Sequence, residues 1–417
     1  MTSHDDTALV RITGVAVGGD GVGREASGRV VFVSGALPGE LVATRVVDER
    51  RDHARAVAAD VVEAAPGRVA PPCPFVAAGC GGCGWQHVEP ASQRALRGDM
   101  VTEALQRLGG VREPVVRPGP ALPTTGYRTT LRGVADEAGR FALRRHHSHD
   151  LVAVPGCLVA HPLVVEVLAE GRFPPGAEVT VRAGARTGER LVVVDLPTDR
   201  AAAAVPDPAG IAVPEGVRVV TGAELAGGKR AWLHEEVAGV RLRVSARSFF
   251  QAGPEAAEAL VEAVGHAAGP EPMAPGTRMA DLYGGVGLFA ATLGRDAHVV
   301  LVEASASSAA DARVNLRELD ARAMRSDVAA WRPRRMDLVV ADPPRAGLGR
   351  SGARAVAASR AARVVLVSCD AGALGRDARL LRGAGYDLVE STVVDVFPQT
   401  PHVEVVSRFD RRPGRPR

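Results

Sequence analysis

The chain has 417 residues, more than one hydrophobic core usually organises, and 46% of them are hydrophobic, so we expect two or three folded domains. The 51 basic and 48 acidic residues leave a formal charge of +3, which by itself does not point to a polyanionic partner. The chain does not open on the basic and apolar segments of a secretion signal, and no window approaches the roughly 18 apolar residues of a membrane-spanning helix. These properties predict a globular cytoplasmic protein with no membrane-embedded part.

Residues 6–66 have the pattern of a small β-barrel. Short runs of β-branched residues alternate there with glycine turns, as in GVAVGGDGVGR and VVFVSGALPGE. A proline-rich break over residues 66–74 ends the pattern. We therefore expect a first domain made of several closely spaced strands.

The region 67–245 is expected to form a central α+β domain. Apolar residues recur at helical spacing over residues 91–109, which predicts a helix. Residues 127–244 mix strands and loops without a clear period. The sequence therefore predicts a domain here without predicting its topology.

The five cysteines are unevenly spread, and their odd number argues against a disulfide framework. Cys73, Cys80 and Cys83 lie close together, and Cys157 follows much later in the same region. One C-x-x-C with scattered partners is compatible with structural zinc or with a 4Fe-4S cluster, and the spacing favours the cluster only slightly. The gap of six residues after Cys73 excludes the cysteine spacing of a radical S-adenosylmethionine enzyme.

Residues 246–417 are expected to form an α/β domain. After residue 276 predicted strands alternate with helices, which indicates a parallel sheet covered by helices. Ligands bind such sheets at the carboxyl ends of the strands. Polar or nucleophilic residues stand at four of these ends: Asp281, Glu303, Asp342 and Cys369.

The glycine loop at residues 281–287 predicts a nucleotide-like cofactor. Its glycines let the backbone approach a ligand, although they also satisfy the dinucleotide pattern G-x-G-x-x-A. Glu303 would accept hydrogen bonds from ribose hydroxyls in either kind of site. The Asp-Pro-Pro-Arg segment at residues 342–345 favours S-adenosylmethionine, because prolines hold Asp342 at the mouth of the pocket. The alternative makes Asp342 a turn residue that ends its strand.

Cys369 is a candidate nucleophile, because it follows the apolar run VVLVS at the same edge of the sheet. Carbon 5 of uracil attacks a methyl sulfonium poorly until a thiolate has added at carbon 6. A base must then remove the carbon 5 proton, and Glu404 at the start of a late strand is the candidate. The simpler interpretations are a buried free cysteine and a surface carboxylate.

With these residues assembled, the chain resembles the RNA 5-methyluridine (uracil-C5) methyltransferases that carry a TRAM domain and a 4Fe-4S cluster. The segments GVAVGGDGVGR and VVFVSGALPGE resemble the TRAM domain, an RNA-binding barrel, and CPFVAAGCGGCGWQH resembles the cluster loop. The segment PGC at residues 155–157 resembles the distant fourth cysteine. The catalytic blocks are resembled, in order, by SFFQAG, DLYGGVG, DPPRAGL, VSCD and HVEVV.

The resemblance implies a Rossmann-like methyltransferase domain that acts on tRNA or ribosomal RNA, with Cys369 as nucleophile and Glu404 as proton acceptor. It implies that Asp327 approaches the adenine and that the helix over residues 91–109 packs on the C-terminal domain. The remaining S-adenosylmethionine contacts that it implies are Gln251, Tyr283, Glu303 and Asp342. The 4Fe-4S ligands that it implies are Cys73, Cys80, Cys83 and Cys157. We expect a monomer.

Two positions depart from the family pattern. Asp370 stands where the family has asparagine, and a carboxylate beside the thiol disfavours the thiolate. Leu288 stands where many relatives have asparagine at the first helical turn. Two other hypotheses stay open: an amino-group methyltransferase that uses residues 342–345 as its acceptor clamp, and an RNA-binding or RNA-folding protein whose pocket has decayed.

Overall fold

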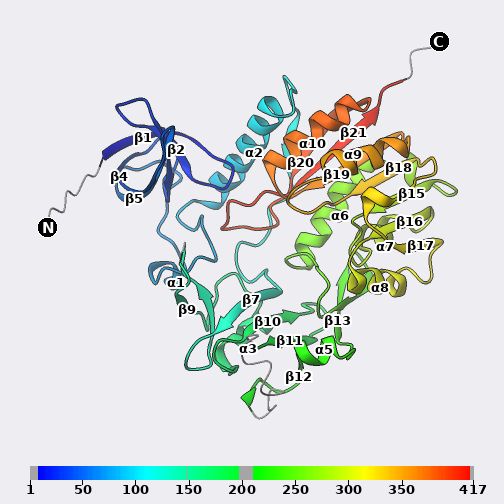
Figure 1. The fold of residues 1–417 in the computed structure, drawn as a ribbon, viewed down its shortest axis with the longest axis horizontal. Helices are drawn as coiled ribbons and strands as arrows, with labels where there is room; N and C mark the ends of the chain where they lie inside the picture. The colour runs from blue at the N-terminus through cyan, green and yellow to red at the C-terminus, as the bar shows by residue number, and fades with distance from the viewer. Residues whose placement is uncertain (1–7, 147, 197–209, 414–417) are drawn as a thin grey trace.

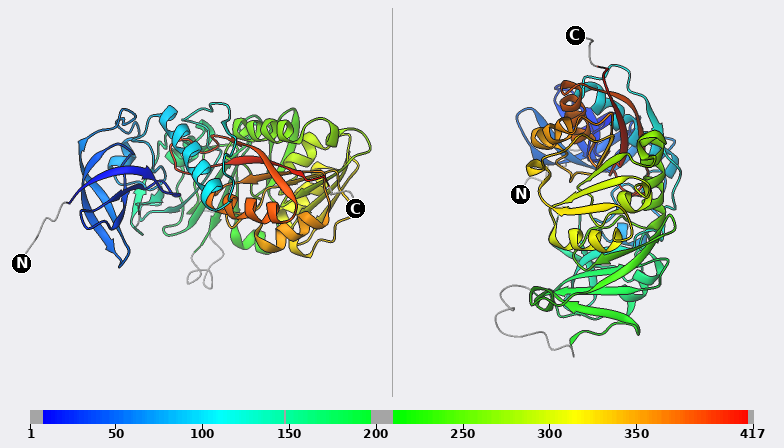
Figure 2. Two further views of the ribbon diagram at one scale, coloured as in Figure 1. Left: turned by 90° about the horizontal axis from the view of Figure 1, so that it is seen from above. Right: turned by 90° about the vertical axis from the view of Figure 1, so that its right-hand side faces the viewer.

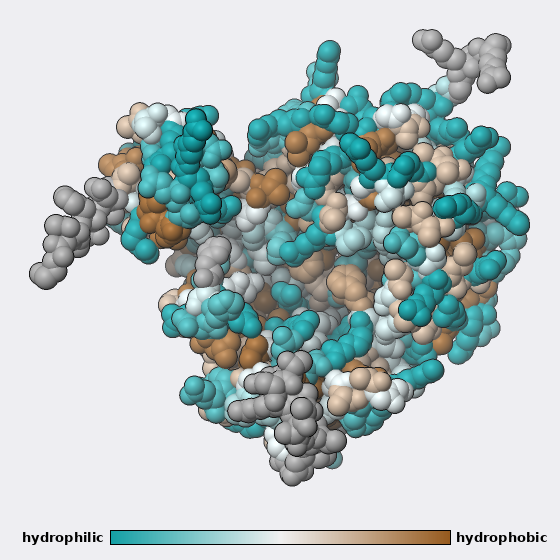
Figure 3. Space-filling view, in the orientation of Figure 1, coloured by the Kyte–Doolittle hydropathy of each residue, from teal (hydrophilic) through white to brown (hydrophobic). Residues whose placement is uncertain are grey.

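The computed structural model describes residues 8–146, 148–196 and 210–413. An N-terminal barrel stands at one end of the molecule, a central sheet lies below it, and a larger α/β unit forms the other side (Figure 1). Hydrophilic residues cover most of the face in Figure 3, with apolar residues only in small groups between them. No helix in the described ranges combines the length and apolar character that crossing a membrane requires.

The N-terminal barrel closes in the order β1-β2-β3-β5-β4, which confirms the predicted barrel. In β1 the side chains of Val10 and Ile12 are buried while the residues beside them are exposed, as expected for a strand with one face on a core. These two residues pack with Val31, Val33 and Val42 inside the barrel. The strands are β1 (Ala8–Val15), β2 (Gly21–Arg24), β3 (Val30–Ser34), β4 (Leu41–Glu49) and β5 (His53–Glu63).

The central unit is a six-stranded sheet in the order β12-β11-β10-β7-β8-β9, with a separate hairpin of β13 and β14. Its strands are β7 (Thr130–Ala135), β8 (Phe141–Arg144), β9 (Leu151–Ala153), β10 (Glu178–Ala183), β11 (Arg190–Asp195), β12 (Val217–Thr221), β13 (Trp232–Val237) and β14 (Val240–Ser245). The helices before and within it are α1 (Pro74–Ala77), α2 (Pro90–Arg107), α3 (Pro162–Glu170) and α5 (Gly222–Ala226).

Apolar and polar residues do not alternate along β11, because both faces of this strand are buried. Val192 and Val194 join one apolar core, and Leu191 and Val193 join another. A strand covered on both faces has a continuous apolar run, which does not reveal its pairing partners. The topology of this region therefore could not be predicted from the sequence.

The C-terminal unit is an eight-stranded sheet in the order β17-β16-β15-β18-β19-β21-β20-β6. β21 is antiparallel to both of its neighbours, while the pairs from β17 to β19 are parallel. The strands are β6 (Val116–Pro118), β15 (Arg278–Leu282), β16 (His298–Glu303), β17 (Ala321–Arg325), β18 (Leu338–Ala341), β19 (Arg363–Ser368), β20 (Tyr386–Val393) and β21 (Val405–Arg411). This arrangement confirms the predicted α/β sheet.

Helices cover both faces of this sheet, as the left view of Figure 2 shows for the green α6 and the orange α9 and α10. One apolar core contains α6, α7 and α8, and the other contains α2, α9 and α10. The helices and 3-10 turns of this unit are α6 (Pro254–Ala268), η2 (Glu271–Met273), α7 (Leu288–Leu293), α8 (Ala306–Asn315), η3 (Val328–Ala330), α9 (Gly349–Ala358) and α10 (Ala371–Gly383).

Two elements that precede the central sheet in the chain lie with the C-terminal unit. Helix α2 packs against α10, and β6 pairs with β20 at the sheet edge. At the middle of the sheet, β15 lies between β16 and β18. The chain adds β16 and β17 on one side of β15 and then returns to add β18 on the other side. Such a switch point leaves a crevice at the carboxyl ends of the strands, which is where ligands bind in doubly wound sheets.

Candidate active site

The loop after β15 has a backbone shape that requires glycine. Gly285 and Gly287 have φ of 55° and 92°, and a Cβ at Gly284 would lie 2.6 Å from Leu301 Cγ. Tyr283 has φ of 58°, an uncommon conformation for an aromatic residue. Glu303 at the end of β16 supports the loop, since its Oε2 accepts a hydrogen bond from the Gly285 N–H at 3.0 Å. The loop is thus fixed in place before any ligand arrives.

Asp281 is fully buried at the end of β15. Its Oδ2 accepts a hydrogen bond from the Ala290 N–H at 3.0 Å, whereas Oδ1 has no hydrogen-bond partner among the described residues. Burial raises the pKa of Asp281 to about 7, and the charges of Asp342 and Glu303 add to this shift. A buried oxygen without a partner costs free energy, so a ligand that supplies a donor is favoured here.

The strand register brings Cys369 and Glu404 opposite each other. Ser368 and Val405 are the last paired residues of antiparallel β19 and β21, so the next position on each side is Cys369 and Glu404. Cys369 is half-buried and Glu404 is buried. Asp342 joins the same edge because β18 and β19 are parallel neighbours.

The charged groups at this edge shift the pKa of the Cys369 thiol. Burial, together with the charges of Glu404 and Asp342, raises the pKa of Cys369 to about 11, and the Arg345 guanidinium opposes this shift. Burial also raises the pKa of Glu404 well above its usual range, with Asp342 adding to the shift and Arg345 again opposing. Burial likewise raises the pKa of Asp342. Sequence reasoning assigned no electrostatic role to Arg345, although it belongs to the Asp-Pro-Pro-Arg segment.

The two departures from the family pattern have local structural roles. Asp370 begins α10, and its Oδ1 accepts a hydrogen bond from the Ala373 N–H at 2.7 Å. Aspartate and asparagine are both good N-cap residues, so either residue can begin this helix. Leu288 is buried in the core at the start of α7.

Tyr283, directly after β15, and Asp327, after β17, interact electrostatically. Burial raises the pKa of Tyr283 to about 12, and the charges of Asp327 and Asp377 contribute. A Cβ at Gly352 in α9 would lie 2.8 Å from the Tyr283 hydroxyl oxygen, so that close contact needs a glycine. Asp327 begins η3 by accepting a hydrogen bond from the Ala329 N–H at 2.7 Å.

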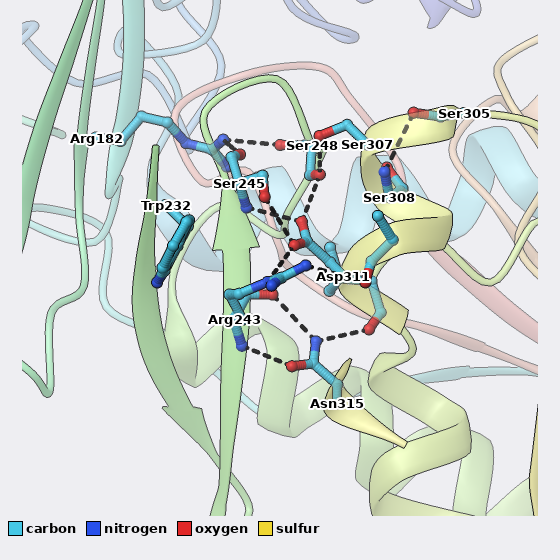
Figure 4. Close-up of polar contacts among 12 residues, drawn as sticks. Arg182, Trp232, Arg243, Ser245, Ser248, Ser305, Ser307, Ser308, Asp311 and Asn315 are labelled. Carbon is cyan, nitrogen blue, oxygen red and sulfur yellow. Dashed lines mark hydrogen bonds and ion pairs between the residues drawn. The ribbon is translucent and has the colours of Figure 1, made fainter. Parts of the chain in front are cut away.

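Gln251 is buried in the loop between β14 and α6, and among the described residues it makes no hydrogen bond to those at the crevice. Its loop is anchored by Arg182 of the central sheet, which donates to Ser245 O at 2.8 Å and Ser248 O at 2.8 Å. The Ser248 hydroxyl also shares a hydrogen bond of 2.9 Å with the Ser307 hydroxyl on α8 (Figure 4). The loop thus joins the central sheet to the C-terminal unit.

Asp311 on α8 is the centre of that junction (Figure 4). Its fully buried carboxylate accepts hydrogen bonds from Arg243 Nε at 2.7 Å, the Ser245 N–H at 2.8 Å, Ser245 Oγ at 2.7 Å and Ser248 Oγ at 2.6 Å. Sequence reasoning did not find Asp311 or Arg182, because single charged residues in a strand and a helix give no local signal of burial.

The four remaining cysteines surround one cavity of about 300 Å³. Burial raises the pKa of Cys83 to about 11, and the charges of Cys157 and Cys80 add to the shift. No group of three or more His, Cys, Asp or Glu side chains in the described ranges is arranged to hold a metal ion. Arg128 and His402 also line the cavity, which places it beside the segment that carries Glu404.

Comparison with known proteins gives the class of this fold. Residues 5–59 match the TRAM domain family. The solved structure of Pyrococcus abyssi tRNA (uracil-54, C5)-methyltransferase, in complex with S-adenosyl-L-homocysteine, superposes with a TM-score of 0.72. It is 22% identical, and the match covers 98% of this chain and 100% of that one. The fold is therefore that of an α/β methyltransferase with an N-terminal TRAM barrel.

Relatives at higher identity define the family. An "uncharacterized RNA methyltransferase" of Streptomyces avermitilis is 36% identical, over 95% of this chain and 96% of that protein. The 23S rRNA (uracil(1939)-C(5))-methyltransferase of Aeromonas hydrophila is 31% identical, over 94% of this chain and 93% of its own length. The chain belongs to this family of RNA methyltransferases, which use S-adenosylmethionine as the methyl donor.

Proposed function

We propose that this enzyme transfers a methyl group from S-adenosylmethionine to carbon 5 of a uridine in tRNA or ribosomal RNA, through a covalent bond between Cys369 and carbon 6. The observation that carries the proposal is the register of β19 and β21, which sets Cys369 opposite the buried Glu404 at the cofactor edge. Uridine in RNA is supported as the target because two of the similar proteins are uracil-C5 methyltransferases of 23S rRNA and of tRNA.

The proposed steps use only these two side chains for covalent and proton chemistry. The Cys369 thiolate adds to carbon 6, and the electron pair of the ring double bond makes carbon 5 nucleophilic. Carbon 5 takes the methyl group, and S-adenosylhomocysteine leaves. Glu404 then accepts the carbon 5 proton, the double bond forms again, and the carbon–sulfur bond breaks to release the thiolate. The raised pKa of Glu404 makes its carboxylate a stronger proton acceptor once it has lost its own proton.

We propose that five residues around the crevice hold S-adenosylmethionine: Gln251, Tyr283, Glu303, Asp327 and Asp342. The family resemblance implies all five, and all except Gln251 stand at the carboxyl edge of the sheet. The Asp281 Oδ1 atom fits the same ligand, because the cofactor carries an ammonium group that can donate to a buried acceptor.

The four cysteines line one cavity of about 300 Å³, and their spacing in the sequence favours a 4Fe-4S cluster slightly over zinc. We propose Cys73, Cys80, Cys83 and Cys157 as the ligands, with a structural or RNA-docking role for the cluster, since methyl transfer from a sulfonium consumes no electrons. Iron analysis of anaerobically purified protein should give about four iron atoms per chain, and Cys83→Ser should lose them. One bound zinc would contradict this assignment.

We also propose that the enzyme is a cytoplasmic monomer that binds RNA. The described cysteines are all free, which suits the reducing cytoplasm. The TRAM barrel suits an RNA partner.

RNA that contains 5-fluorouracil tests the mechanism. Fluorine cannot leave as a cation, so the reaction should stop at a covalent adduct that carries the methyl group and survives denaturation. Peptide mapping should place the bond at Cys369, and Cys369→Ala should form none. If no tRNA or ribosomal RNA forms an adduct, the proposed mechanism is wrong. A fully active Cys369→Ala variant would instead favour an amino-group methyltransferase.

A further inference from the structure

The loop that leads to the proposed base is held by side chains from the N-terminal half of the chain. We call residues 394–404, between β20 and β21, the base loop; Figure 1 draws it in red, near the cyan α2. Its end is joined to its start, because the Val394 N–H donates to Glu404 O at 2.8 Å. Contacts that fix this loop therefore fix the position of Glu404.

Arg97 of α2 is fully buried and reaches several points of the base loop. Its Nε donates to His402 O at 2.9 Å, and its Nη2 donates to Thr400 O at 2.6 Å and Phe397 O at 3.2 Å. Its Nη1 forms an ion pair with Asp395 at 2.8 Å. One planar guanidinium thus fixes the loop at four residues, including the residue two positions before the base.

Gln93, one turn earlier on α2, holds the base loop at a strained residue. Gln399 has φ of 67°, a left-handed conformation that non-glycine residues seldom adopt. Its N–H donates to Gln93 Oε1 at 2.8 Å, and its own side-chain oxygen accepts from Gln93 Nε2 at 3.1 Å. Backbone strain of this kind persists only where surrounding contacts enforce it.

We propose that Arg97 is a positioning residue for the catalytic base: its guanidinium sets the base loop so that Glu404 meets the carbon 5 proton of the uracil. This inference rests on the proposed function, since it assigns Arg97 to the step that Glu404 performs. Adduct formation and methyl transfer come before that step, whereas release of Cys369 depends on it. A displaced base therefore slows release, and the methylated adduct accumulates on ordinary RNA.

The test compares four proteins: wild type, Arg97→Ala, Glu404→Gln and Leu105→Ala. Leu105 is buried on the same helix and makes no hydrogen bond to the base loop, so its truncation controls for loss of packing. Each protein is incubated with methyl-labelled S-adenosylmethionine and unmodified tRNA or ribosomal RNA, and the labelled adduct is separated under denaturing conditions. S-adenosylmethionine affinity is measured in parallel.

We expect Arg97→Ala and Glu404→Gln to accumulate adduct while turnover falls by roughly 100-fold, the cost of about 1 Å of misplacement at a reacting group. Leu105→Ala should show the wild-type adduct fraction. The inference is overturned if Arg97→Ala binds S-adenosylmethionine normally yet shows no more adduct than Leu105→Ala. If Glu404→Gln also shows none, the proposed chemistry itself fails.

A chemical rescue separates positioning from general damage. A cavity of about 300 Å³ lined by Arg94, Arg97 and Asp395 adjoins the guanidinium, so methylguanidinium has room to enter when Arg97 is truncated. It should lower the adduct fraction of Arg97→Ala and leave that of Glu404→Gln unchanged. If Arg97→Ala does not fold, Arg97→Lys carries the same comparison, because its ammonium lacks the planar fork that reaches several carbonyls.

Discussion

The thiol of Cys369 stands among carboxylates, which is an unfavourable place for a thiolate. Its pKa of about 11 in the ligand-free enzyme means that the thiol is protonated at neutral pH. Arg345 is the charge that opposes this effect. A ligand that adds positive charge beside the thiol, or that neutralises one of the carboxylates, should therefore favour the thiolate.

Alkylation of the free enzyme tests this balance. Because only the thiolate reacts, labelling of Cys369 by iodoacetamide should rise about tenfold per pH unit from pH 7 toward 10. Glu404→Gln should speed labelling at a fixed pH and Arg345→Ala should slow it, since they remove opposite charges. Quantitative mass spectrometry of the Cys369 peptide gives the rates. Labelling that levels off near pH 8 would contradict the raised pKa.

Asp370 provides a second test at the residue scale. Asp370→Asn restores the family residue and keeps an N-cap for α10, so the melting temperature should stay near that of wild type. Loss of a charge beside the thiol should also raise the rate of adduct formation. Asp370→Ala should lose about 1 kcal/mol of helix stability, seen as a lower melting temperature. Equal melting of all three proteins would show that the cap contributes little.

At the scale of elements, the junction of α8 with β14 depends on one buried carboxylate. Asp311 accepts from four donor groups, and all four belong to β14 or to the loop that continues from it to Gln251. Removing one member of a buried ionic network leaves the others unpaired, which costs more than the interaction itself.

Asp311→Ala should therefore cost about 3–5 kcal/mol and lower the melting temperature by several degrees. It should also weaken S-adenosylmethionine binding, because the Gln251 loop loses its anchor. Asp320→Ala is the matched control, since Asp320 is exposed and forms a surface ion pair with His298. Similar losses from both substitutions would contradict the role of the buried network. Differential scanning fluorimetry and calorimetry supply the two readouts.

At the scale of the whole molecule, three units meet at the base loop. The barrel contributes Gly19, whose carbonyl accepts a hydrogen bond from Trp85 Nε1 at 3.1 Å. The backbone N–H of Trp85 in turn donates to Gln399 O at 2.9 Å. Tyr127 donates its hydroxyl to Pro398 O at 2.9 Å. RNA-binding barrel, cysteine segment and catalytic domain thus share one loop.

Neighbouring glycines in the barrel give a matched test of this contact. A Cβ at Gly19 would lie 2.3 Å from Pro401 Cβ, whereas a Cβ at Gly18 would meet nothing within 4 Å, and both residues have positive φ. Gly18→Ala should cost only backbone strain of about 1 kcal/mol, while Gly19→Ala should also push the barrel off the base loop. We expect kcat/KM for RNA to fall about tenfold more in Gly19→Ala, with S-adenosylmethionine affinity unchanged. Equal effects of the two substitutions would contradict the contact.

The sequence by itself determined the parts whose signals are local. The barrel strands, the parallel strands and the residues that follow them, such as Asp342 and Cys369, could be read from short patterns, because a strand end and its loop are neighbours in the chain. The same reasoning found the four cysteines, although spacing alone did not separate zinc from a cluster.

Only the tertiary structure decided what depends on distant partners. Arg97 and His402 are 305 positions apart, and Asp311 and Ser245 are 66 apart, so no local pattern could pair them. For the same reason the sequence did not predict β6, which pairs with β20 at the edge of the C-terminal sheet although it precedes the central sheet in the chain. The sequence already indicated Glu404 as a candidate base at the start of a late strand. Its position opposite Cys369 depends on the antiparallel register of β19 and β21, which the sequence does not fix.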